Sequence, residues 1–173
     1  MVAAGQRRAA GTSYAAPVGD VDADAFVREA MRLAGEAGTR GDPPFGAVLV
    51  DRFGTTVARA SNRQVSGDDP TAHAEIELLR AAAWAGHRAP FDGYLIAVNA
   101  EPCSMCASAI VKAAPGELIY GAPHESHMDP DLGVAEVFAR ARRPPRVRAG
   151  VLADEAADQI ASFRSAEKAP PID

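Results

Sequence analysis

Two short stretches of the chain carry side chains whose types and spacing could bind one metal ion. His73 and Glu75 stand two residues apart in the first stretch, and Cys103 and Cys106 stand three apart in the second. Imidazole nitrogens and cysteine thiolates are preferred zinc ligands, and a catalytic zinc takes three protein ligands and leaves a fourth position for water. The sequence therefore predicts a zinc site on His73, Cys103 and Cys106, with the Glu75 carboxylate beside the open position.

The open position predicts hydrolytic chemistry. Zinc can lower the pKa of a bound water from about 15.7 toward roughly 7, and Glu75 could take the proton of that water. We expect attack on a ring carbon that bears an exocyclic amine, with Glu75 relaying the proton to the ring nitrogen and then to the departing amine. The sequence thus predicts deamination of a small aminated heterocycle, with release of ammonia.

A closed structural zinc site is one alternative, and it would need a fourth protein ligand. The remaining histidines are His87, His124 and His127, and none of them stands at zinc-finger or zinc-ribbon spacing. A catalytically silent zinc-binding or interaction protein is a further alternative, against which the intact Glu75 argues. The compound pattern of histidine, acid, proline and paired cysteines favours an enzyme.

Alternating helices and strands must bring the two stretches together. Apolar runs bounded by turn residues predict strands at 45–50, 55–61, 94–98, 118–121 and 147–152. Apolar stripes with capping residues predict helices at 20–37, 71–85, 103–114, 130–141 and 155–165. This order predicts a single three-layer α/β/α domain over residues 20–168, with an antiparallel hairpin followed by parallel strands.

Helix starts are expected to position the predicted zinc ligands. Thr71 is predicted to cap the second helix, so His73 and Glu75 would fall in its first turn. Cys103 and Cys106 open the third helix and share one face of it, because side chains at i and i+3 are neighbours. The positive ends of both helix dipoles would then favour thiolate over thiol at the metal.

Length and composition fit one globular domain. The chain has 173 residues and a formal net charge of −5, which argues against a nucleic-acid partner and for a small neutral substrate. Two cysteines cannot form a distributed disulfide framework, so a reduced cytoplasmic compartment is expected. The lack of a long apolar run predicts no membrane partner. Residues 1–19 are predicted to be a flexible leader and residues 169–173 a tail.

Two further features have simple structural interpretations. Trp84 is predicted to lie in the core or in an interface. A group of arginines, here called the arginine cluster, is predicted to form a solvated face, with contact to nucleic acid or another partner as the alternative. It comprises Arg140, Arg142, Arg143, Arg146 and Arg148.

Four motifs resemble, in the same order, those of the cytidine-deaminase superfamily, within the branch that holds guanine deaminases and tRNA adenosine deaminases. They are Pro43-Pro44-Phe45-Gly46-Ala47-Val48, Ser61-Asn62-Arg63, Asp69-Pro70-Thr71-Ala72-His73-Ala74-Glu75 and Glu101-Pro102-Cys103-Ser104-Met105-Cys106. The resemblance covers roughly residues 25–122. It implies a five-stranded mixed sheet between helices, a homodimer with shared active-site walls, zinc as the cofactor and Glu75 as the proton shuttle.

The resemblance also implies substrate contacts. Asn62 would hydrogen-bond the base, and Phe45 and Ala74 would lie around the substrate with it. Lys112 stands near the place where guanine deaminases have a stacking tryptophan and tRNA deaminases a histidine. Stacking on the base at this position is therefore not expected.

The substrate is predicted less sharply than the reaction. Glu125 or Asp129 would supply the second acid that guanine deaminases use, and a guanine-like base is the first prediction. Cytosine, cytidine or another aminated heterocycle is an alternative, because the stacking residue is missing. A tRNA adenosine deaminase is a further alternative, for which the arginine cluster argues and against which the net charge of −5 argues.

Overall fold

The computed structural model describes residues 21–123 and 131–167. The predicted leader, the predicted tail, and the loop acids Glu125 and Asp129 lie outside the described residues. The elements are α1 (Ala23–Thr39), β1 (Gly46–Val50), β2 (Thr56–Ser61), α2 (Ala74–Trp84), β3 (Leu95–Ala100), α3 (Ser104–Ala113), β4 (Glu117–Ala122), α4 (Val134–Phe138), β5 (Arg146–Arg148) and α5 (Ala153–Glu167). Within the described ranges, every helix is too short or too polar to cross a membrane.

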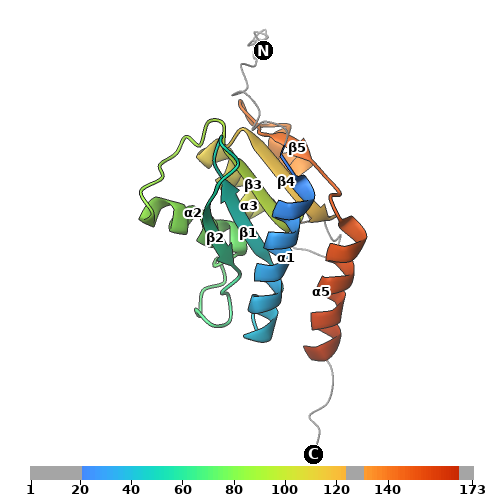
Figure 1. Cartoon of the computed structure of the whole chain (residues 1–173). Helices are drawn as coiled ribbons and strands as arrows, with labels where there is room; N and C mark the ends of the chain where they lie inside the picture. Colours follow the sequence, from blue (N-terminus) through green and yellow to red (C-terminus); the bar gives the residue numbers. More distant parts are fainter. Residues whose placement is uncertain (1–20, 124–130, 168–173) are drawn as a thin grey trace, which may run out of the picture.

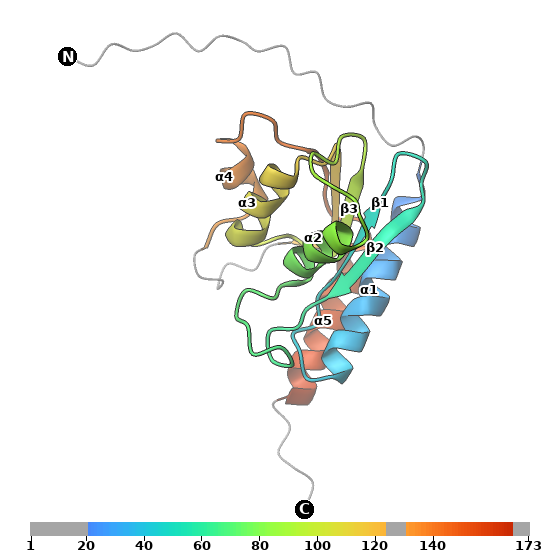
Figure 2. The same ribbon diagram turned by 90° about the vertical axis from the view of Figure 1, so that its left-hand side faces the viewer.

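Five strands form one mixed sheet in the order β2-β1-β3-β4-β5. β1 runs antiparallel to both β2 and β3, whereas β3, β4 and β5 run parallel to one another. Helices α1 and α5 cover one face of the sheet, and α2, α3 and α4 cover the other (Figure 1, Figure 2). The predicted three-layer fold with its opening hairpin is therefore confirmed.

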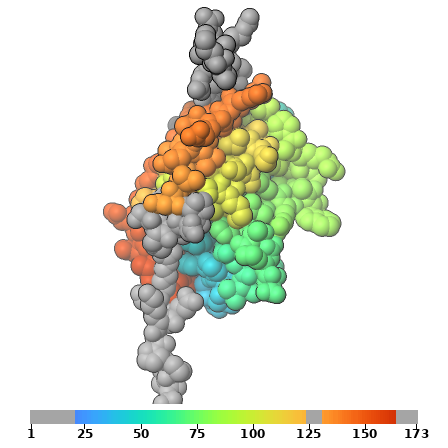
Figure 3. Space-filling model, turned by 180° about the vertical axis from the view of Figure 1, so that it is seen from behind, coloured from blue at the N-terminus to red at the C-terminus, as the bar shows by residue number. Residues whose placement is uncertain are grey.

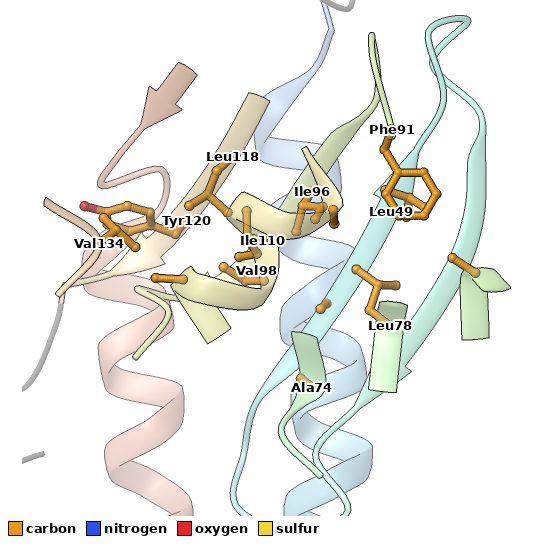
Figure 4. Packing of buried hydrophobic residues seen from close by; sticks show 14 of the residues in the cluster. Leu49, Ala74, Leu78, Phe91, Ile96, Val98, Ile110, Leu118, Tyr120 and Val134 are labelled. Atoms are coloured by element: carbon orange, nitrogen blue, oxygen red, sulfur yellow. The ribbon is translucent and has the colours of Figure 1, made fainter. Parts of the chain in front are cut away.

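Apolar side chains fill both spaces between the sheet and its helices. On one face, Leu49, Ile96 and Val98 pack against α2 and α3, and Figure 4 shows Leu78 and Ile110 reaching toward them. The alternate positions of β1 and β3 pack against α1 in a second cluster. Because helices cover both faces, β1 is buried along its whole length, and such a strand is a continuous apolar run in the sequence.

The starts of α2 and α3 differ from the prediction by small shifts. Thr71 does not cap α2, because its amide and its hydroxyl both donate hydrogen bonds to the Asp69 carboxylate. His73 is the N-cap residue of α2, and Cys103 is the N-cap residue of α3. Two of the predicted zinc ligands thus directly precede a helix and do not lie within its first turn.

The C-terminal elements and Trp84 also differ from the prediction. α4 is shorter than the predicted helix 130–141, and β5 covers Arg146–Arg148 in place of 147–152. Gly150 and Leu152 have positive φ angles, which do not continue a strand. Trp84 is 91% exposed at the end of α2, so it lies outside the core of this chain. Its placement in an interface stays a prediction.

Candidate metal centre and substrate pocket

The predicted zinc ligands meet near the end of β3, where α2 and α3 begin. Nδ1 of His73 lies 3.7 Å from Sγ of Cys103. The ligand atoms of His73, Cys103 and Cys106 all lie within 4.8 Å of one another. In a tetrahedral site, zinc–sulfur bonds of about 2.3 Å and zinc–nitrogen bonds of about 2.0–2.1 Å separate the sulfur and nitrogen by about 3.6 Å. The group therefore fits a zinc ion with one coordination position left over.

Hydrogen bonding around Cys103 favours its thiolate form. A hydrogen bond from Cys106, followed by one from His73, lowers the pKa of the Cys103 thiol to about 4. The contact with Cys103 in turn raises the pKa of His73. The N-terminus of α3 adds the positive end of a helix dipole beside the sulfur. Cys103 is thus a thiolate at neutral pH, which is the form of cysteine that binds zinc.

Glu75 is the buried acid beside this group. It lies in the first turn of α2, two residues after His73, and is only 7% exposed. Burial raises the pKa of the Glu75 carboxyl, and a hydrogen bond joins the carboxyl to Cys106. A carboxyl held in this way beside a metal site can accept a proton and return it within one reaction cycle.

A small pocket contains Glu75 and two of the predicted zinc ligands. The pocket brings together side chains from the starts of β1, α2 and α3 and from the ends of β2 and β3. Its lining residues are Phe45, Gly46, Asn62, His73, Glu75, Val98, Asn99, Ala100, Glu101 and Cys103. The predicted proton shuttle therefore faces the same space as an aromatic ring and two amides.

The structure brings some of the predicted substrate contacts to this pocket and leaves others away from it. Phe45 and Asn62 line the pocket, and the buried Asn62 amide is oriented by two hydrogen bonds with Gln64. Ala74 is 1% exposed and packs in the core cluster. Lys112 lines a separate cavity at the C-terminal ends of α2 and α3. Lys112 of this chain is therefore not placed against the pocket that holds Glu75.

Asn99 is a pocket residue whose role the sequence did not reveal. Its Oδ1 accepts a hydrogen bond from the Gly46 N–H at 2.9 Å, and its Nδ2 donates to the Pro44 carbonyl at 3.0 Å. These bonds tie β3 to the segment that carries Phe45. A Cβ on Gly46 would lie 2.1 Å from the carbonyl oxygen of Ala30, so this close packing requires glycine. The only sequence signal for Asn99 is a polar residue at the end of an apolar strand.

Asp42 fixes the loop that follows Asn62. Its buried carboxylate accepts hydrogen bonds from the Val65 N–H, from the N–H and hydroxyl of Ser66, and from the Arg40 guanidinium. Burial opposes the charged form, but the hydrogen bonds from Ser66, Val65 and Arg40 outweigh burial and lower the pKa of Asp42. The loop beside the pocket thus depends on a charged aspartate.

Replacing Asp42 with Ala is expected to lower the free energy of unfolding by about 2–4 kcal/mol at neutral pH, because four hydrogen bonds to the buried carboxylate are lost. The folded pKa lies below the unfolded value of about 3.9, so the contribution is full above that value and is lost as the pH falls through the folded pKa. Urea unfolding at neutral and acidic pH measures both effects. A difference between the two proteins that does not shrink in acid would contradict this account.

Comparisons with known proteins agree with this site. Residues 21–122, more than half of the chain, match the family model of the cytidine and deoxycytidylate deaminase zinc-binding region. A tRNA-specific adenosine deaminase of Agrobacterium fabrum is 37% identical over 144 residues, which are 80% of this chain and 91% of that protein. A guanine deaminase of Bacillus subtilis is 31% identical over 126 residues, which are 72% of this chain and 80% of that protein. A solved chain from studies of A-to-I editing by tRNA:A34 deaminases has a TM-score of 0.68 and 36% identity, covering 78% of this chain and 98% of that chain. The protein therefore belongs to the cytidine and deoxycytidylate deaminase family and is a zinc-dependent deaminase.

Proposed function

We propose that the protein hydrolyses the exocyclic amine of an adenosine within a tRNA. The observation that carries the hydrolytic chemistry of this proposal is the pocket in which His73, Cys103, Glu75 and Asn62 meet. In the reaction, the C–N bond to the amine breaks and a C=O bond forms, with water as the source of oxygen and ammonia as the product. Zinc, when bound by His73, Cys103 and Cys106, supplies the activation of that water.

The residues of this chain move the proton and hold the base. Glu75 accepts one proton from water and delivers it to the ring nitrogen, and it then passes the proton of the added hydroxyl to the departing amine. Its burial keeps bulk solvent away from this transfer. Asn62 presents its amide to the edge of the base, and Phe45 offers an aromatic surface to the flat ring. The hydrogen bonds of Asn99 with Gly46 and Pro44 hold the segment that carries Phe45.

The relatives support adenosine in tRNA above the guanine-like base that the sequence predicts first. The tRNA-specific adenosine deaminase of A. fabrum is 37% identical and is matched over 91% of its length, against 31% and 80% for the guanine deaminase of B. subtilis. The solved chain from tRNA:A34 deaminase studies agrees, at 36% identity. Deaminases that act on nucleic acids read an unstacked base in a pocket of this kind.

A free guanine-like base is the second candidate, and charge favours it. The net charge is −5, and part of the arginine cluster lies far from the pocket. β5 pairs with Glu117–Ile119 at the start of β4, whereas the pocket lies at the opposite end, where β3 reaches Ala100. A free base would need no basic surface beside the pocket.

Product analysis on one zinc-loaded preparation distinguishes these candidates. The substrates are a tRNA with adenosine at the wobble position, the same tRNA with guanosine there, and free adenine, guanine, cytosine and their nucleosides. We expect ammonia together with inosine from the adenosine-containing tRNA. Ammonia from guanine alone would favour the second candidate. Zinc binding without turnover of any of these substrates would favour a catalytically silent protein.

A further inference from the structure

Glu101 is a second carboxylate at the pocket, in addition to Glu75. It directly follows β3, precedes the ligand Cys103 by two residues, and lines the pocket with both of them. Glu101 makes hydrogen bonds to β4 and to the start of α4, and these contacts indicate a positioning role.

Main-chain and side-chain groups of Glu101 hold two points of the chain that are distant in sequence. The Glu101 N–H donates a hydrogen bond of 2.8 Å to the carbonyl of Ala122, at the end of β4. Its Oε1 accepts a hydrogen bond of 2.9 Å from the N–H of Val134, at the start of α4. Ala122 and Val134 are twelve positions apart in the sequence, so one residue joins two separate elements.

Neighbouring residues shield the Glu101 carboxylate and depend on its position. The hydroxyl of Tyr120, which is 8% exposed, hydrogen-bonds Glu101; burial and this carboxylate raise the pKa of Tyr120 to about 12. A Cβ on Gly133 would lie 2.5 Å from Oε1 of Glu101, so any side chain at that position would displace the carboxylate. Hydrogen bonds to a shielded carboxylate are stronger than those between neutral groups.

We propose that Glu101 is a positioning residue, which fixes the end of β4 and the start of α4 against the loop that carries Cys103. Val134 and Phe138 of α4 belong to the main core cluster, and α4 packs on α3. Figure 3 shows the orange surface that includes α4 lying against the yellow surface of α3. These contacts hold Glu101, which itself lines the pocket, against the core, and we infer that its position controls substrate binding more than zinc binding. This inference rests on the deaminase function proposed above.

Three substitutions change the Glu101 contacts in different ways. Glu101→Ala removes the side-chain contacts with Val134 and Tyr120, whereas Gly133→Ala keeps the glutamate but displaces its carboxylate. Both are expected to raise KM about tenfold with kcat nearly unchanged, and to speed amide exchange at Val134 about tenfold. Glu101→Gln retains an acceptor oxygen and is expected to have an intermediate effect. Zinc content should equal that of the wild type in all three.

Glu117→Gln is the matched control. Glu117 is also a buried carboxylate, but it lies at the start of β4 and binds Arg148. This change is expected to lower the melting temperature while leaving KM and exchange at Val134 as in the wild type. For Glu101→Ala, unchanged KM and unchanged exchange would overturn the proposal, and so would a loss of zinc. Hydrogen exchange needs no substrate, so it tests the Glu101 contacts even if none of the proposed substrates is deaminated.

Discussion

Glu75→Gln is expected to lower the rate of ammonia release by about 10²–10⁴-fold and to leave zinc bound. Glutamine has nearly the shape of glutamate, but its amide cannot accept the proton that water must lose. Solvent is a poor substitute for the carboxylate, because the side chain is only 7% exposed. The group of His73, Cys103 and Cys106 is unchanged by the substitution. Metal analysis and an ammonia assay on one preparation measure both expectations.

Glu77→Gln is the control for this experiment, because it changes the charge in the same helical turn. Glu77 forms an ion pair with Arg80 and is not part of the pocket lining. Ammonia release by Glu77→Gln should stay within about twofold of the wild type, since exposed ion pairs contribute little. Full turnover by Glu75→Gln would exclude Glu75 as the proton shuttle. Loss of zinc from the same variant would instead assign Glu75 to the metal site.

The fold is predictable from the sequence where burial determines the residue types. β1 is apolar at every position and β3 nearly so, because helices cover both faces of the sheet, and such runs indicate central strands. β5 is an edge strand of three residues that includes two arginines, so its apolar signal is weak. The turn after β5 includes a positive φ angle at Leu152, and no sequence pattern predicts a positive φ angle for a leucine.

At the start of α2, two hydrogen-bonding patterns compete for Thr71, and the sequence does not show which one forms. Thr71 has the right type and place for an N-cap, and Asp69 two residues earlier has a suitable side chain as well. In the structure the Asp69 carboxylate accepts from the amide and the hydroxyl of Thr71. This local turn delays the helix and leaves His73 as its N-cap. The identity of the ligand was predictable, but its position relative to the helix was not.

In the candidate site, the zinc ligands are predictable from the sequence, whereas the pocket walls are not. Zinc ligands are few residue types at short, fixed spacings, so His73, Cys103 and Cys106 can be recognised without a fold. Pocket walls depend on which segments meet. Lys112 lies six positions after Cys106, yet its place on α3 directs it to a different cavity. Asn99 reaches the pocket only because β3 lies beside the start of β1.

Cys106→Ser is expected to remove zinc and, with it, ammonia release. Serine is close in size to cysteine, so the fully buried position at the start of α3 should still pack. Its hydroxyl is a poor zinc ligand, however, and His73 and Cys103 alone leave the ion incompletely held. Changes in residues that only orient the ligands cost about 10–100-fold in metal affinity, and the loss of a ligand itself should cost more.

Zinc titration combined with thermal unfolding separates this loss of metal from a loss of fold. Metal-free wild type and metal-free Cys106→Ser should melt at similar temperatures, and added zinc should raise the melting temperature of the wild type only, because a ligand stabilises the state that binds it. Ser108→Ala is the control, since Ser108 is exposed on the same helix. A Cys106→Ser protein that kept zinc and turnover would show that other residues hold the ion. A metal-free variant that is already unfolded, beside a wild type that stays folded when a chelator removes its zinc, would instead assign Cys106 to the core.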